Sequence, residues 1–261
     1  MPSRAEAAVN FPPFNLPPDM KKQCLGLSLA VWILSSTLFA QESPSADGEK
    51  RQTAQTFEVK IDLDYLLFLP RGYDADADKK WPLLVFLHGA GERGSDISKV
   101  KVHGPPKLVE SDPDFPFVVI SPQCPKDAFW NTGHLLALIT RTIKEHNVDP
   151  DRVYLTGLSM GGFGSWALAA EAPEMFAAVA PICGGGDPRM AKKLVDIPIW
   201  VFHGDADRVV AISGSQRMVD AIKAAGGTNV EFTIYEGVGH DSWTETYGNE
   251  ELYEWFLKHK R

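Results

Sequence analysis

Residues 157–161 (GLSMG) place a serine between two glycines, and the flanking segments determine how that serine can be held. Residues 152–156 are rich in strand formers, and residues 162–170 have the composition of a helix with small residues on its packing face. A strand, a sharp turn and a helix would hold Ser159 in a strained conformation with its hydroxyl exposed above a sheet. A Cβ at either glycine would collide with the neighbouring strand or helix. We therefore predict that Ser159 is a nucleophile, and not part of an ordinary glycine-rich loop.

A serine hydroxyl needs a base that removes its proton and a group that orients the base. After a strand–turn–helix nucleophile, these partners follow in the order acid, then histidine, on loops after later strands. The alternating polar and apolar residues 230–235 predict such a strand, and residues 237–240 after it end in His240. This position predicts that His240 is the base.

The acid comes from the loop before that strand, where two aspartates compete. The apolar residues 197–203 predict a strand that leads into Asp205 and Asp207. Asp205 directly follows Gly204, where a short acidic side chain commonly caps its own turn. Asp207 lies further out, just before the apolar pair 209–210 that would anchor it. We predict Asp207 as the acid and a structural role for Asp205.

An oxyanion hole requires donors fixed where negative charge develops in the reaction. The backbone N–H of Met160, the residue after the nucleophile, is one expected donor. Residues 81–87 are a continuous apolar run, typical of a strand buried on both faces, and lead into a glycine-rich turn that can offer the Ala90 N–H. His88 lies on the wrong loop for a base, so we expect it to bond nearby backbone.

Four motifs occur in order along the chain: residues 87–94 (LHGAGERG), 157–162 (GLSMGG), 181–186 (PICGGG) and 239–243 (GHDSW). Together they resemble the bacterial phospholipase/carboxylesterase branch of the α/β-hydrolases, close to the prolyl-oligopeptidase-like esterases. The resemblance covers approximately residues 56–260. It implies an α/β-hydrolase fold and a catalytic triad of Ser159, Asp207 and His240. It also implies that Ala90 and Met160 supply the oxyanion donors. The reaction would be the hydrolysis of acyl or aryl esters, and the family does not determine which ester is the substrate.

The coarse pattern of the chain predicts an α/β fold. Strands are expected near residues 56–61, 65–69, 83–87, 117–121, 152–156, 177–182, 198–203 and 230–235. Helices are expected near 134–146, 160–171, 213–225 and 250–259, with a shorter one around 188–195, and residues 147–151 read as a turn. This alternation predicts a mostly parallel eight-stranded sheet with helices on both faces.

Only residues 184–198 separate the sixth expected strand from the seventh, which leaves no room for a large cap domain. We expect an open cleft, suited to short acyl chains or to acyl groups displayed on a larger molecule. Around it, Trp130 and Trp243 are candidates for stacking on an aryl group or a sugar. For Trp243, packing under the His240 loop, which would fix that loop, is the favoured alternative. Arg93 would favour a substrate carboxylate if it faces the cleft; otherwise it should pair with Glu92.

The N-terminal segment has the pattern of a targeting signal. Residues 20–22 (MKK) form a basic start, and residues 24–39 are apolar. Ala40 lies just before an acceptable cleavage site for a signal peptidase. The apolar run is short for a membrane anchor. We predict an N-terminal extension and signal peptide over residues 1–40, with translation starting at Met20. A linker over 41–55 and a catalytic domain over 56–261 should follow. After cleavage of the signal peptide, we expect the protein to be exported, as a periplasmic or a secreted protein.

Charge and cysteine usage restrict the remaining functions. The net charge of −8 and the lack of a basic patch argue against nucleic acid and anionic membrane surfaces as partners. No metal-binding motif occurs, so no cofactor is expected. Cys124 and Cys183 follow strands that two others should separate, about 14 Å at about 4.8 Å per strand. A disulfide needs Cα atoms within about 7 Å, so two free thiols are expected.

The sequence therefore predicts an exported serine hydrolase that cleaves small or polymer-attached carboxylic esters. A peptidase or an acyltransferase would use the same triad, and a non-catalytic binding protein would be expected to lack one of its members. The natural ester and the oligomeric state are left open.

Overall fold

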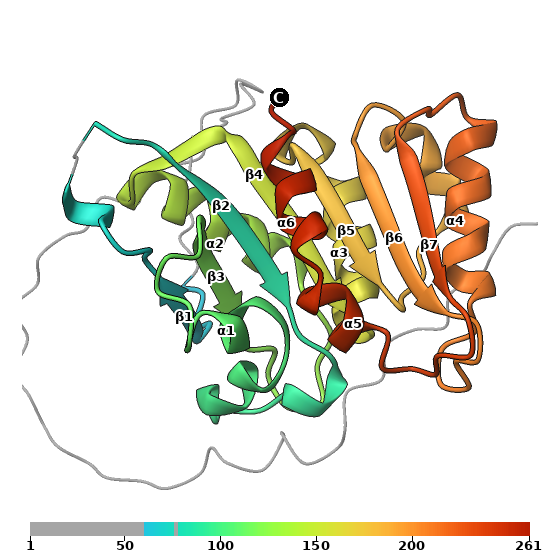
Figure 1. Cartoon of the computed structure of the whole chain (residues 1–261), viewed down its shortest axis with the longest axis horizontal. Helices are drawn as coiled ribbons and strands as arrows, with labels where there is room; N and C mark the ends of the chain where they lie inside the picture. The colour runs from blue at the N-terminus through green and yellow to red at the C-terminus, as the bar shows by residue number, and fades with distance from the viewer. Residues whose placement is uncertain (1–59, 76–77) are drawn as a thin grey trace, which may run out of the picture. The chain divides into compact units, whose positions relative to one another are not determined.

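A computed structural model describes residues 60–75 and 78–261 (Figure 1), and a seven-stranded sheet organises them. The order across the sheet is β1-β3-β2-β4-β5-β6-β7, with β1 antiparallel to β3 and every other pair parallel. The strands are β1 (Tyr65–Phe68), β2 (Trp81–Leu87), β3 (Val118–Pro122), β4 (Val148–Leu158), β5 (Ala178–Ile182), β6 (Ile199–Gly204) and β7 (Val230–Tyr235). The predicted α/β fold with a mostly parallel sheet is confirmed.

The N-terminal predictions fall almost entirely outside the described residues. These are the extension and signal peptide over 1–40, the linker over 41–55, and residues 56–59 of the first expected strand. The last two residues of that strand, Lys60 and Ile61, are described and do not belong to a strand. The described part of the chain has seven strands, and the first of the eight predicted strands lies mostly outside it.

Helices cover both faces of the sheet, as predicted. α2 (Thr132–Glu145), α3 (Met160–Glu171) and α4 (Ser213–Ala224) lie on one face, and α5 (Trp243–Gly248) and α6 (Glu250–Leu257) lie on the other (Figure 1). Successive β2 side chains enter two separate cores: Leu83 packs with residues of α2, α3 and α4, whereas Leu84 packs with residues of α5 and α6. Burial on both faces explains the continuous apolar sequence of β2.

Two local predictions differ from the structure. Residues 147–151 were expected to form a turn, but β4 already begins at Val148, which is buried and pairs with Trp81. The polar residues 149–151 of β4 lie where the pairing with β2 is irregular: the register shifts between Trp81 and Leu83. The short helix expected over 188–195 is the 3₁₀ helix Pro188–Lys193.

The loop between β5 and β6 carries only that 3₁₀ helix, so in the described residues no cap domain covers the sheet at this point. Cys124 and Cys183 are both buried and unbridged, and β2 and β4 separate the strands that they follow, as predicted. Within residues 60–75 and 78–261, no helix has the length and apolar character to cross a membrane.

Candidate active site

Ser159 lies at the sharp turn between β4 and α3, in the strained conformation that the sequence predicted. Its φ of 51° and ψ of −114° lie outside the regions that L-residues favour. Its N–H donates to the Ile182 carbonyl at 3.0 Å, and its own carbonyl accepts from the Phe163 N–H at 3.0 Å. These two bonds fix the turn between the end of β5 and the first turn of α3.

Glycines permit the tight packing around this turn. A Cβ at Gly157 would collide with the carbonyl of Gly161, and a Cβ at Gly161 would collide with the carbonyl of Leu87 at the end of β2. A Cβ at Gly162 would meet the Ile182 carbonyl. The start of α3 can therefore lie directly against two neighbouring strands, as predicted for the glycines that flank Ser159.

The structure brings Ser159, His240 and Asp207 into one hydrogen-bonded row. His240 Nε2 lies 2.9 Å from Ser159 Oγ, and His240 Nδ1 lies 2.7 Å from Asp207 Oδ2. The three residues come from the turns after β4, β7 and β6, which all end at the same edge of the sheet. Both distances are within the range for direct proton transfer and for orientation of the imidazole.

Asp207 is held by its backbone surroundings as well as by His240. Its side chain is 0% exposed, and Oδ1 accepts from the N–H groups of Val209 and Val210 at 2.8 and 2.9 Å. Burial by itself would raise the pKa of Asp207, but the His240 hydrogen bond and the two N–H donors outweigh it and lower that pKa. Asp207 is therefore suited to remain a carboxylate beside a histidine that gains a proton.

Asp205 has a different place in the structure. Its Oδ1 accepts from the Gly237 N–H at 2.7 Å, which ties the loop after β6 to the loop after β7. Asp205 therefore bonds the backbone and not His240, but it stabilises the loop after β7 and not, as the sequence had predicted, its own turn.

His203, the penultimate residue of β6, also contacts Asp207. This contact was not predicted from the sequence. His203 Nε2 lies 3.1 Å from Asp207 Oδ2 and 3.0 Å from the Val210 carbonyl. His203 Nδ1 lies 2.9 Å from Ser215 Oγ, which donates to the Gly184 carbonyl at 2.7 Å. The sequence does place a histidine in an otherwise apolar strand, which indicates a buried polar ring. Such a ring requires hydrogen-bond partners.

The two expected oxyanion donors lie on the segments that border Ser159. Within the described part of the chain, neither the Ala90 N–H nor the Met160 N–H donates a hydrogen bond to another protein group. Met160 is the first residue of α3, and Ala90 begins the 3₁₀ helix that follows β2. A Cβ at Gly89 would lie 3.7 Å from Ser159 Cβ, so this loop approaches the serine closely.

His88 is a structural residue, as predicted. It is fully buried, its Nδ1 lies 2.6 Å from the Gly89 carbonyl, and its Nε2 accepts from the Cys124 N–H at 2.9 Å. Burial lowers the pKa of His88, against smaller opposing effects of the Gly89 hydrogen bond and the Glu92 charge. The ring therefore links the ends of β2 and β3 in its neutral form.

The expected ion pair between Glu92 and Arg93 does not form in the described structure. Arg93 Nε donates to the Ala90 carbonyl at 3.0 Å, and its Nη1 donates to the Ala128 carbonyl at 3.1 Å. The Glu92 carboxylate lies 3.9 Å from a ring nitrogen of His88 and of His103. Adjacent residues on a 3₁₀ turn project in different directions, which is why the pairing prediction was wrong.

The two tryptophans named as rim residues have different surroundings. Trp130 Nε1 lies 3.3 Å from the His88 carbonyl, and its ring packs against that of His88. The Trp243 ring lies edge-on to His240, with centroids 5.2 Å apart. Trp243 thus packs beside the His240 ring, which was the alternative role considered for it.

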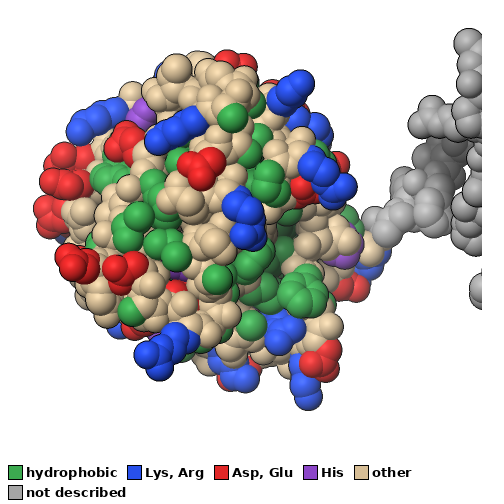
Figure 2. Space-filling view, turned by 90° about the vertical axis from the view of Figure 1, so that its right-hand side faces the viewer, with side chains coloured by type: hydrophobic (Ala, Val, Ile, Leu, Met, Phe, Trp, Pro, Cys, Tyr) green, Lys and Arg blue, Asp and Glu red, His purple; other side chains and the backbone are tan. Residues whose placement is uncertain are grey.

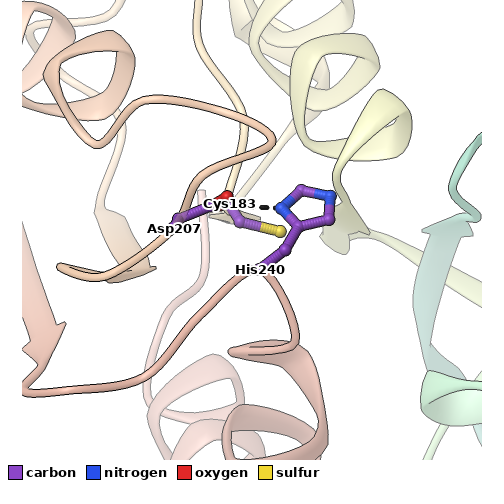
Figure 3. A group of neighbouring side chains, drawn as sticks. All are labelled: Cys183, Asp207 and His240. Carbon is purple, nitrogen blue, oxygen red and sulfur yellow. Dashed lines mark hydrogen bonds and ion pairs between the residues drawn. The ribbon is translucent and has the colours of Figure 1, made fainter.

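Cys183 lies beside the acid and the base (Figure 3), at a φ of 40°. Its sulfur and one ligand atom each of Asp207 and His240 lie within 4.8 Å of one another, a set of atom types that zinc accepts. Burial raises the pKa of the Cys183 thiol to about 12. A metal at this point would also have to break the 2.7 Å hydrogen bond between Asp207 and His240. The geometry favours a hydrogen-bonded pair over a metal centre.

Comparison with known proteins identifies the superfamily. The chain is 39% identical to a thermostable esterase of known crystal structure, with a TM-score of 0.67 over 77% of this chain and 60% of that chain. The model of the dienelactone hydrolase family matches residues 131–251. The chain belongs to the α/β-hydrolase superfamily.

Several curated relatives of this α/β-hydrolase have esterase names. It is 26% identical over 223 residues to a probable feruloyl esterase C of Aspergillus flavus, covering 83% of this chain and 82% of the relative. It is also 29% identical over 170 residues to poly(3-hydroxyalkanoate) depolymerase C of Paucimonas lemoignei. That alignment covers 59% of this chain but only 36% of the depolymerase.

Proposed function

We propose that this α/β-hydrolase cleaves carboxylic esters of short-chain or aryl acyl groups through an acyl-enzyme on Ser159. The observation that carries the proposal is the continuous row of hydrogen bonds from Ser159 Oγ through the His240 ring to Asp207, at 2.9 and 2.7 Å. Such a row supplies a nucleophile, a base and an orienting carboxylate in contact with one another.

In the proposed reaction, Ser159 Oγ attacks the ester carbonyl while its proton passes to His240 Nε2. Asp207, which accepts from Nδ1, holds the imidazole in the required tautomer and stabilises its charged form. The C–O bond then breaks, and His240 protonates the departing alcohol. A water molecule, deprotonated by His240, attacks the acyl-enzyme and releases the acid and free Ser159.

The negative charge on the tetrahedral intermediate needs fixed donors. We assign this role to the N–H groups of Ala90 and Met160, which are free of protein acceptors and border Ser159. Met160 is the first residue of α3, where the helix dipole adds to the attraction for an anion. Preorganised donors of this kind contribute about 3–4 kcal/mol each to the transition state.

The choice of ester has two supports. The loop between β5 and β6 carries no cap domain in the described residues, and one relative is named a probable feruloyl esterase C. Of the residues expected to contact substrate, Trp243 is retained in the proposal because its ring borders His240, where the alcohol departs. Arg93 and Trp130 already donate to backbone carbonyls, so we assign them to loop structure first.

We also propose that the enzyme is exported, because of the signal-like pattern over residues 20–40. Expression in a bacterial host, followed by fractionation and N-terminal sequencing, tests this. We expect exported protein that begins at Gln41, and protein retained with an intact N-terminus would contradict the proposal.

The catalytic proposal is tested with p-nitrophenyl esters from acetyl to palmitoyl, together with methyl ferulate. Wild-type protein is compared with Ser159→Ala and His240→Ala, each checked for folding by circular dichroism. We expect hydrolysis by the wild type and none above background by the two variants. Folded wild-type protein without activity on any ester, or full activity in Ser159→Ala, would refute the proposal. Transfer to an added alcohol in preference to water would identify an acyltransferase.

A further inference from the structure

A cavity of about 570 Å³ lies between α3, the loop after β5 and α4, and we call it the α3 pocket. Figure 2 shows the face that carries α4, where hydrophobic side chains gather around a hollow. The pocket's volume falls within the range of small-molecule binding sites. Its apolar lining consists of Phe163, Trp166, Ala167, Ala170, Met190 and Met218.

Two walls of the α3 pocket belong to segments that are hydrogen-bonded to the Ser159 backbone. One wall is α3, and its Phe163 is the residue whose N–H donates to the Ser159 carbonyl. The other wall is the loop after Ile182, whose carbonyl accepts from the Ser159 N–H. The two walls meet where a Cβ at Gly185 would lie 3.2 Å from the Phe163 ring. With about 1.5 Å of rise per residue, Phe163 and Ala167 lie about 6 and 12 Å along α3 from Ser159.

The position of His240 decides which part of an ester could enter this pocket. In the proposed reaction the alcohol leaves next to His240, because His240 Nε2 protonates it. His240 precedes α5, and α5 packs on the opposite face of the sheet from α3 and α4 (Figure 1). The α3 pocket therefore lies on the opposite face of the sheet from α5, which is the side left for the acyl group when the alcohol leaves next to His240.

The charges around the α3 pocket favour an uncharged occupant. No lysine, arginine or histidine contributes to its lining, and its two acidic residues are Glu171 and Asp187. Asp187 is already paired with Arg189 at 2.6 Å. An acyl group that ends in a carboxylate would find no basic side chain in the lining, whereas two flexible methionines can adapt to apolar groups of different shape, including aromatic rings.

We propose that the α3 pocket receives the apolar acyl group of the ester, and that Phe163, 45% exposed at the Ser159 end, determines which acyl groups enter. The proposal rests on the proposed esterase function and specifies its acyl site. An octanoyl chain and a cinnamoyl group share the required chemistry, and the experiment tests them in separate arms.

Ala167 offers a substitution that fills the pocket from its exposed helical side. Ala167→Trp should lower kcat/KM for p-nitrophenyl octanoate, p-nitrophenyl cinnamate or both by about tenfold or more relative to p-nitrophenyl acetate. Ala224→Trp is the matched control, because Ala224 is an exposed alanine of α4 that does not line the pocket. The control should keep the wild-type ratio, and thermal unfolding verifies that both variants fold.

An unchanged acyl ratio in folded Ala167→Trp would overturn the proposal. The proposal would also fail if Ala167→Trp lowered kcat/KM for 1-naphthyl acetate relative to ethyl acetate and left the acyl ratio unchanged. In that case the pocket would hold the alcohol part of the ester. A binding measurement separates this inference from the esterase proposal: Ser159→Ala should bind ethyl cinnamate, detected by calorimetry, and adding Ala167→Trp should weaken that binding about tenfold or more. Binding unaffected by Ala167→Trp would refute the pocket whatever the catalytic result.

Discussion

His203 Nε2 lies 3.1 Å from Oδ2 of Asp207, the same oxygen that His240 Nδ1 contacts at 2.7 Å. Because the carboxylate only accepts, His203 must carry a hydrogen on Nε2 and donate it. Two imidazole rings thus hold one oxygen from two directions. This arrangement limits the rotation of Asp207 and, through it, the orientation of His240.

Removal of that donor should reduce turnover more than substrate binding. We expect His203→Leu to lower kcat by about 10²-fold with little change in KM, because a small displacement of a catalytic group has effects of this size. His203→Gln can still donate near the Nε2 position and should recover part of the loss. Steady-state kinetics at temperatures below each variant's unfolding transition provide the test. Equal kcat in folded His203→Leu and wild type would show that the contact has no part in turnover.

The acid assignment separates two aspartates that lie two residues apart. Asp207→Asn should lower kcat by about 10⁴-fold, because the amide cannot hold His240 in the required tautomer. Asp205→Asn is the matched control, since Asp205 contacts the Gly237 N–H and not His240. It should retain most of the wild-type kcat. Loss of activity in Asp205→Asn with retention in Asp207→Asn would reverse the assignment.

His88 should make the folded state sensitive to mild acid. Its pKa is lowered from 6.5 in the native state, so below about pH 6.5 the unfolded chain binds a proton that buried His88 resists. The free energy of unfolding should then fall as the pH decreases from 7.5 to 5. Urea unfolding across this range should show a shallower fall for His88→Gln, although that variant is less stable at pH 7.5. Parallel curves for the two proteins would contradict the burial argument.

The two buried thiols should be unreactive in the native protein. Burial raises the pKa of Cys124, and raises that of Cys183 to about 12, so the reactive thiolate is scarce at neutral pH. In a Cys24→Ser background, a thiol reagent such as DTNB should modify neither residue before unfolding and both afterwards. Fast modification of the native protein, or failure of either thiol to react in denaturant without reductant, would disagree with the structure.

The sequence could predict the parts of the site that follow directly from strand ends. Ser159, Asp207 and His240 each follow a strand with a clear apolar or alternating pattern, and parallel strands bring their carboxyl ends to one edge. The start of β4 was harder, because the polar residues 149–151 resemble a turn although Val148 before them is buried beside β2.

Other features depend on contacts that sequence patterns do not contain. α1 (Gly104–Leu108) has prolines at its second and third residues, which suggest a loop although proline is compatible with the first turn of a helix. α5 is short, and its buried Tyr247 is held through a hydrogen bond between its hydroxyl and that of Thr156 on β4. The contact between His203 and Asp207 required the three-dimensional path of the loop after β6.

The order in which the strands enter the sheet has a consequence during synthesis of the protein. Ser159 and Asp207 are translated before β7, whereas His240 follows β7, the last strand of the described chain to emerge from the ribosome. A nascent polypeptide therefore carries its proposed nucleophile without a base until β7 has paired with β6. Under the proposed mechanism, the serine stays inert through most of translation, and hydrolytic activity becomes possible only after β7 and the His240 loop that follows it have been made.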